Sequence, residues 1–403
     1  MEERDARRGW LFSIVSAAPS VSLFSLAVAL LTCQPFTRDA TLVVIASLSP
    51  ESQQAAYEQL QAQAGELGVA CELKAVPYRL LQESVFAFDP ENKKSRWDLA
   101  LVPASWLERL GRQRSILEVP IQHVQQLQRA VVPLAMLAVA WGESTWGYPM
   151  ALDAPALIYN PALVPTPPTT LAAVARLAVP EGVLPLAVDL ADLDAVLPLL
   201  AAAQGLDNPQ DLKDLGQAWD RFVASVGPAL AYPGALSVWL APNAQAAQAQ
   251  LFAEGKLAAF VGGAQADAIL DKVGVPRSVV PLPPPCDRCP QPRPWARCIA
   301  LVVSSSCAYP DLAQALAEKL ASSRRNVAFS AATGMLPVLG GQETTAFLLE
   351  DPDKLGFLRA LGVARLAPPD PERMSLATLW EAKFLHLNAL AKSEAIPPRR
   401  AAR

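Results

Sequence analysis

The sequence predicts an α/β protein in which helices flank mainly parallel sheets. From residue 40 onward, short runs rich in β-branched residues alternate with segments of helical length, and this spacing is typical of right-handed βαβ units. The composition fits the same class, because 52% of the 403 residues are hydrophobic and 18% are charged. A disordered chain is more polar than this. The length predicts two or three folded units.

The first predicted strand is followed by a helix with recognisable ends. Residues 41–46 form a short β-branched run, as expected for a buried parallel strand. Ser49-Pro50-Glu51 has the features of a helix start, and the helix is expected to end at Gly68. The next predicted elements are strands over 69–76 and 97–102 and a helix from 105 to 110. Because ligands bind beyond the carboxyl ends of parallel strands, the loops after Ala46 and Val102 are the first candidate site.

The amino-terminal segment predicts export or membrane anchoring. Arg7 and Arg8 precede an uncharged run from Trp10 to Leu31, which as a helix would span roughly 33 Å, about the thickness of a hydrocarbon core. Residues 1–32 are therefore a signal peptide or an uncleaved anchor, and the arginine pair also resembles a twin-arginine signal. The four residues ending at Cys33 resemble the bacterial lipoprotein box, so Cys33 is a candidate for lipidation and membrane tethering.

The charge balance argues against a nucleic-acid partner. The chain carries 34 basic and 38 acidic side chains, for a formal net charge of -4. No excess of positive charge is available to hold phosphate backbones.

Catalytic motifs are scarce in the sequence. The only histidines, His123 and His386, are far apart, and no phosphate-binding loop of the G-x-x-x-x-G-K-[ST] type occurs. We therefore expect no enzymatic activity, no metal site and no cofactor.

Three segments follow one another along the chain as WGYPMALDAPALIYNPALV (146–164), QLFAEGKLAAFVGG (250–263) and ATGMLPV (332–338). Together they resemble the extracellular solute-binding proteins of ABC importers, the family that includes the maltose-binding protein. The resemblance implies a two-lobed periplasmic-binding-protein fold of type II, with a mainly parallel, helix-flanked sheet in each lobe. The expected division is lobe 1, 39–150 plus 286–335; lobe 2, 151–285 plus 336–396; and a tail, 397–403.

The resemblance also implies a function. Such a protein captures a carbohydrate or polyol between its lobes, closes by hinge bending and delivers the solute to the permease subunits of an ABC importer. It is expected at the periplasmic or extracellular face of a bacterial cell membrane, tethered through its amino terminus. The alternative is a divergent sensor or structural partner without a transport role, and a carbohydrate-active enzyme is a third hypothesis.

The family's motifs assign candidate ligand-binding residues. Asp153 stands where the family places an acidic residue that accepts sugar hydroxyls, and Gln265 stands where sugar binders often carry a tryptophan. Sugar sites pair polar groups with aromatic rings, so Trp106, Trp239 and Trp380 are the remaining candidates for stacking. The full predicted set is Ser47, Ser105, Trp106, Asp153, Asp192, Asp194, Trp239, Gln265 and Trp380.

The cysteines beyond Cys33 are Cys71, Cys286, Cys289, Cys298 and Cys307. A strand over 299–306 would separate Cys298 from Cys307 by roughly 25–30 Å, too far for a shared metal or bridge. In an exported protein we expect one disulfide, between Cys298 and either Cys286 or Cys289. Cys71 and Cys307 are expected to remain thiols buried on strands.

Overall fold

The computed structural model describes residues 40–394, except 49, 88–96, 242, 323, 342–343, 346–347, 349–350 and 369. All elements below belong to the compact unit Asp39–Arg403. The predicted signal or anchor at 1–32, the lipidation candidate Cys33 and the tail at 397–403 lie outside the described residues. Among the helices that the structure describes, none combines the length and the apolarity needed to cross a bilayer.

The first sheet has six strands in the order β12-β11-β3-β1-β2, with β6 paired to β11. Its strands are β1 (Thr41–Ala46), β2 (Ala70–Ala75), β3 (Leu99–Pro103), β6 (Tyr148–Asp153), β11 (Trp295–Val303) and β12 (Arg365–Leu366). β1 runs parallel to β2 and β3, whereas β11 runs antiparallel to β3 and β6. The first three strands predicted from the sequence are thus confirmed, with ends shifted by at most two residues.

The second sheet has four strands in the order β10-β7-β9-β8. They are β7 (Ala156–Tyr159), β8 (Ala187–Val188), β9 (Ala259–Gly262) and β10 (Ser278–Pro281). β7 is antiparallel to both β9 and β10, and only β8 and β9 are parallel. The first sheet is thus mainly parallel, as expected, with three parallel pairings out of five, whereas the second sheet is mainly antiparallel. A separate hairpin joins β4 (Ala140–Trp141) to β5 (Ser144–Thr145).

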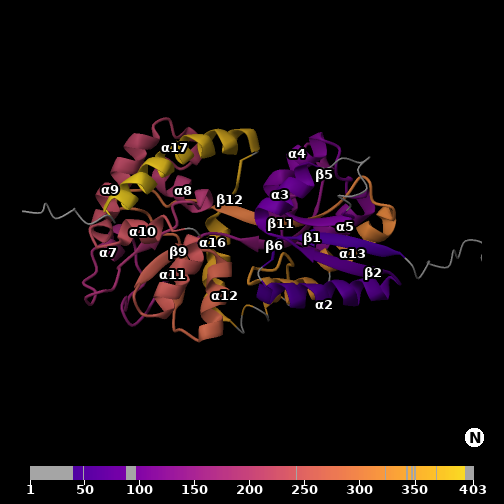
Figure 1. Ribbon diagram of the computed structural model, residues 1–403, viewed down its shortest axis with the longest axis horizontal. Helices are drawn as coiled ribbons and strands as arrows, with labels where there is room; N and C mark the ends of the chain where they lie inside the picture. Colours follow the sequence, from indigo (N-terminus) through magenta and orange to yellow (C-terminus); the bar gives the residue numbers. More distant parts are fainter. Residues whose placement is uncertain are drawn as a thin grey trace, which may run out of the picture. The chain divides into compact units, whose positions relative to one another are not determined.

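Helices cover both sheets (Figure 1). Around the first sheet lie α2 (Pro50–Glu66), α3 (Tyr78–Phe86), α4 (Leu107–Arg112), α5 (Ile121–Ala130), α6 (Pro133–Ala138), α13 (Pro310–Ser322) and α14 (Arg325–Thr333). The others are α7 (Leu171–Ala175), α8 (Leu193–Ala203), α9 (Leu215–Leu230), α10 (Ala235–Trp239), α11 (Ala244–Ala253), α12 (Ala264–Val273), α16 (Pro352–Val363) and α17 (Asp370–Glu394). Short 3-10 turns are η2 (Ala104–Trp106) and η3 (Pro209–Asp211).

Local sequence explains where these elements sit and end. Every residue of β6, β7 and β9 is buried, because helices cover both faces of the sheets and leave no solvent face for polar alternation. Gly68 ends α2 with a φ of 72°, a conformation that favours glycine. The side chain of Thr170 caps α7 by accepting from the Ala173 N–H at 3.1 Å.

The chain passes between the two sheets at several places. Ala154-Pro155 links β6 to β7, and residues 282–294 link β10 to β11. After α14, Leu336 forms a bridge with Leu152 at the end of β6, and the chain then reaches α16, which packs on β10. The two sheets are thus joined by several short links, and their buried residues form one continuous hydrophobic cluster.

The cysteine pairing predicted from the sequence is wrong. Cys286 bonds to Cys289 within one turn, where the two Cα atoms are 5.1 Å apart. Cys298 is a free, buried thiol inside β11, because that strand begins at Trp295 and not at the expected residue 299. Cys71 is buried on β2 as predicted, whereas Cys307 is half-buried in the loop that follows β11.

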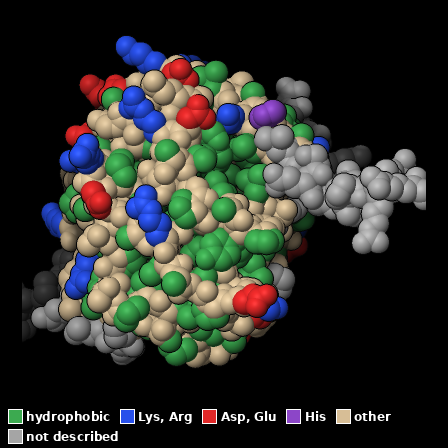
Figure 2. All heavy atoms as spheres, turned by 90° about the vertical axis from the view of Figure 1, so that its left-hand side faces the viewer, with side chains coloured by type: hydrophobic (Ala, Val, Ile, Leu, Met, Phe, Trp, Pro, Cys, Tyr) green, Lys and Arg blue, Asp and Glu red, His purple; other side chains and the backbone are tan. Residues whose placement is uncertain are grey.

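The surface shown in Figure 2 carries charges of both signs. On this face basic and acidic side chains are interspersed, with apolar side chains between them. The face shown therefore carries no continuous patch of positive or negative charge, which agrees with the nearly equal numbers of basic and acidic residues in the chain.

Candidate functional site

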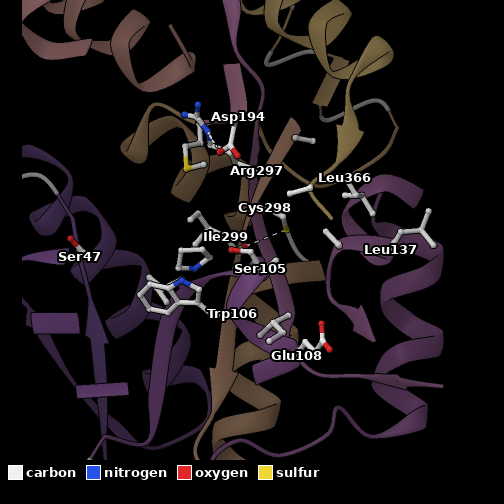
Figure 3. Close-up of a pocket in the computed structure, with 18 of the residues that line it drawn as sticks. Ser47, Ser105, Trp106, Glu108, Leu137, Asp194, Arg297, Cys298, Ile299 and Leu366 are labelled. Atoms are coloured by element: carbon white, nitrogen blue, oxygen red, sulfur yellow. Dashed lines mark hydrogen bonds and ion pairs between the residues drawn. The ribbon is translucent and has the colours of Figure 1, made fainter. Parts of the chain in front are cut away.

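A cavity of about 580 Å³ lies where the strand ends of the first sheet meet residues from α8 and α12 (Figure 3). Ser47 follows β1, and Ser105 and Trp106 belong to η2, directly after β3. Gln265 of α12 and Asp194 of α8 complete the polar lining from the predicted set. The structure thus brings together in one cavity five of the nine predicted residues.

Arg297 is the central charged group of this cavity, and the sequence analysis did not single it out. In the β6–β11 ladder Arg297 lies opposite Asp153, and its Nη1 donates to Asp153 Oδ2 at 3.4 Å. Its Nε donates to Asp194 Oδ2 at 2.8 Å, and its Nη2 to Asp192 Oδ2. Asp192 caps α8 and Asp194 lies in its first turn, so one guanidinium joins β6, β11 and α8.

The three carboxylates are buried and compete for one cation. Burial raises the pKa of Asp192 to about 6, although Arg297 acts in the opposite direction and Asp194 adds to the rise. Burial also raises the pKa of Asp153, against the effect of Arg297 and of the Ala264 N–H. Burial disfavours the charge on Arg297, but the carboxylates outweigh it and raise its pKa. The arrangement keeps the guanidinium charged and leaves a negative balance around it.

Asp153 lies against the second glycine of the Gly262-Gly263 pair. Its Oδ1 accepts a hydrogen bond from the Ala264 N–H at 2.8 Å. A Cβ at Gly263 would lie 2.1 Å from Asp153 Oδ2, which no side chain permits. Asp153 is 1% exposed and does not line the cavity, so it contacts the cavity through Arg297 and not directly.

Two predicted stacking residues lie in the interior. Trp239 is 0% exposed and donates its Nε1 hydrogen to the Leu186 carbonyl at 3.1 Å. Trp380 is 2% exposed and donates to the Leu190 carbonyl at 2.8 Å. Neither residue lines the cavity, so neither offers an open ring face to a solute there. Indole rings with their N–H satisfied in this way are core residues.

Other aromatic rings line the cavity instead. Tyr78 begins α3 and Trp141 ends β4, and Tyr78 packs on Trp106 with ring centroids 5.4 Å apart. A search for aromatic residues near predicted loops would have included both positions. No sequence motif marks Arg297 as a site residue. Its role depends on the register of β6 and β11, which places it beside Asp153, 144 residues earlier in the chain.

Outside the cavity, the carboxylates of Asp267, Asp271 and Asp351 approach one another closely enough to suggest a cation site. Arg277 already binds Asp267 and Asp271, and Lys354 binds Asp351. Because all three carboxylates already pair with protein cations, we assign no metal to them.

Comparison with known proteins supports the same architecture. The sequence profile of a family described as bacterial extracellular solute-binding protein matches residues 55–354, about three quarters of the chain. The solved structure of the Thermus thermophilus maltotriose binding protein bound with maltotriose has a TM-score of 0.70 at 21% identity, covering 89% of this chain and 95% of that one.

A second similar structure is the maltose-maltodextrin binding protein of Alicyclobacillus acidocaldarius. Its TM-score is 0.68 at 16% identity, and the match covers 89% of this chain and 97% of that one. At such identities the likeness establishes the two-lobed maltose-binding-protein fold and leaves the ligand open. No curated protein matches the sequence.

Proposed function

Because the chain belongs to the bacterial extracellular solute-binding proteins, we propose that it captures a carbohydrate or polyol in the cavity and delivers it to an ABC permease. The family and both similar structures are binding proteins rather than enzymes. An extracellular location follows from the family.

The lining of the cavity supports a polyhydroxylated solute. Ser47, Ser105 and Gln265 offer small polar groups, and the Asp194–Arg297 pair offers a strong acceptor and donor. Trp106 lies among them with a ring on which the C–H face of a sugar can pack. The volume of about 580 Å³ is in the range of small-molecule sites. This combination of polar groups with an aromatic ring carries the proposal.

Lobe closure is the expected way to hold the solute. We assign lobe 1 to 39–150 plus 286–335 and lobe 2 to 151–285 plus 336–396, with the passages between the sheets acting as hinges. The passages support this assignment because each joins an element of one sheet to an element packed in the other.

Membrane tethering completes the proposal. Residues 1–32 would direct export, and either lipidation at Cys33 or retention of the segment as an anchor would keep the protein beside its permease. Tethering of this kind raises the effective concentration of the binding protein beside its permease.

A thermal-shift panel tests the binding function. The full-length protein would be heated with monosaccharides, oligosaccharides and polyols. A solute at 100 times its dissociation constant is expected to add about 2.7 kcal/mol to the free energy of unfolding. No shift with any member of the panel would contradict solute binding and favour a sensor or structural partner.

A further inference from the structure

Glu108 is a lining residue of the cavity to which the proposed function has given no role. It lies in the first turn of α4, and its side chain is 11% exposed. Its Oε1 accepts from Arg112 Nη2 at 2.7 Å. Its Oε2 is buried and accepts no hydrogen bond from any residue that the structure describes. A buried carboxylate oxygen of this kind favours a ligand that brings a hydrogen-bond donor.

The charge of the cavity favours a cationic donor. At the other end of the lining, Arg297 faces the carboxylates of Asp153, Asp192 and Asp194. Figure 3 shows Glu108 well separated from the Asp194–Arg297 pair. Arg112 compensates Glu108, but the three carboxylates around Arg297 exceed its charge by two. An anionic solute would add to this negative balance, whereas an ammonium group would reduce it.

Aromatic rings of the same lining suit an ammonium group. Tyr78, Trp106 and Trp141 all face the cavity, and ring faces attract cations. Trp141 already shows this property, since the Arg112 guanidinium lies 4.9 Å from its ring centroid. The side chain of Arg112 is 63% exposed, so this contact lies toward solvent and leaves Glu108 Oε2 on the buried side.

We propose that the cavity selects a solute with a protonated amine, such as an amino sugar or amino polyol. The Glu108 side chain turns so that Oε2 reaches the cavity and accepts from the ammonium group, and hydroxyl groups of the same solute bind at the Asp194–Arg297 end. This inference rests on the proposed function, because it specifies the class of solute for the same cavity.

Titration calorimetry with matched solutes tests the inference. Full-length protein at pH 7 would be titrated with glucosamine, glucose and N-acetylglucosamine, and with the corresponding disaccharides. The amine is expected to bind at least tenfold more tightly than either neutral partner. Equal or weaker binding of the amine overturns the inference and leaves the proposed function intact. Failure of every solute, neutral ones included, contradicts both.

Substitution of the carboxylate gives a second test. Glu108→Gln keeps the size of the side chain and removes its charge, so the preference for the amine is expected to fall to threefold or less. The control Glu143→Gln removes the same charge from an exposed residue outside the lining and is expected to keep the preference. A preserved preference in Glu108→Gln overturns the inference.

The wild-type protein offers a readout that needs no variant. The affinity of the amine is expected to fall as the pH rises past the pKa of the solute amine, because only the ammonium form carries the charge. The affinity of the neutral partner should stay constant over the same interval. Parallel pH profiles for both solutes overturn the inference.

Discussion

Gly263 leaves room for the carboxylate that binds Arg297. A Cβ at this position would overlap Asp153 Oδ2 at 2.1 Å. We expect Gly263→Ala to displace Asp153, weaken the hydrogen bond from Ala264 and lower the free energy of unfolding by about 2–4 kcal/mol. Urea denaturation of the variant and the wild type measures this difference.

A second glycine provides the matched control. Gly65 is exposed in α2, and a Cβ there meets nothing within 4 Å. Gly65→Ala should therefore stabilise the protein by up to about 1 kcal/mol, since alanine restricts the unfolded chain and favours a helix. Equal stabilities of Gly263→Ala and the wild type would show that Asp153 does not occupy this space.

Asp192 is expected to make the stability of the protein fall as the pH rises. Burial raises the pKa of Asp192 in the folded protein to about 6, above roughly 3.9 in the unfolded chain. Its contribution to stability is therefore present below pH ~4 and is lost as the pH rises through 6. Asp192→Asn preserves the helix cap and removes the titration.

The difference in stability between the wild type and Asp192→Asn is expected to change with pH in one direction. The free energy of unfolding of the wild type, relative to Asp192→Asn, is expected to fall by roughly 3 kcal/mol between pH 4 and pH 7. Chemical denaturation at several pH values measures it. A relative stability that is flat or rises with pH would contradict the buried, charge-crowded position of Asp192.

Three elements meet at Arg297, and its removal would leave their carboxylates facing one another. Arg297→Ala leaves Asp153, Asp192 and Asp194 without their guanidinium, and we expect a loss of about 3–5 kcal/mol. Arg297→Lys should recover only part, because an ammonium cannot donate to three carboxylates in the same planar geometry.

An exposed ion pair serves as the control for this loss. Arg79 and Glu83 pair on the surface of α3, with side chains 88% and 55% exposed. Arg79→Ala is expected to cost less than about 0.5 kcal/mol. If denaturation experiments found similar losses for Arg297→Ala and Arg79→Ala, the buried network would contribute little to stability.

The cysteines of β2, of β11 and of the segment between β10 and β11 carry a prediction about thiol reactivity and disulfide pairing. Burial raises the pKa of both Cys71 and Cys298 to about 12, so neither forms an appreciable thiolate at neutral pH. Both should react with an alkylating reagent only after unfolding. Mass mapping of non-reduced peptides should find Cys286 linked to Cys289, and a peptide joined through Cys298 would contradict the structure.

Elements could be predicted from the sequence where local signals define them. The run at 41–46 has the same ends as β1, and the helix predicted between Ser49 and Gly68 corresponds to α2, which ends at Glu66, two residues before Gly68. Strand direction in the second sheet could not be predicted this way. It depends on how the chain connects β6 to β7 and β10 to β11, and no local periodicity records that path.

The whole molecule places residues from distant segments around one cavity. Motif matching found Ser47, Ser105, Trp106, Asp194 and Gln265, because each follows or begins a predicted element at a sheet edge. It also selected Trp239 and Trp380, whose burial in the core depends on tertiary packing. Arg297 and Glu108 required the structure, since their roles depend on contacts with side chains from other elements.

Titration calorimetry of a cavity-filling variant tests the central claim, that a solute binds in this cavity. Ser105→Trp would fill the lining, and Ser375→Trp would place the same side chain on an exposed position of α17. The solute with the largest thermal shift is expected to bind the wild type and Ser375→Trp with equal affinity and Ser105→Trp at least tenfold more weakly. Undiminished binding by Ser105→Trp would place the solute elsewhere and contradict the account.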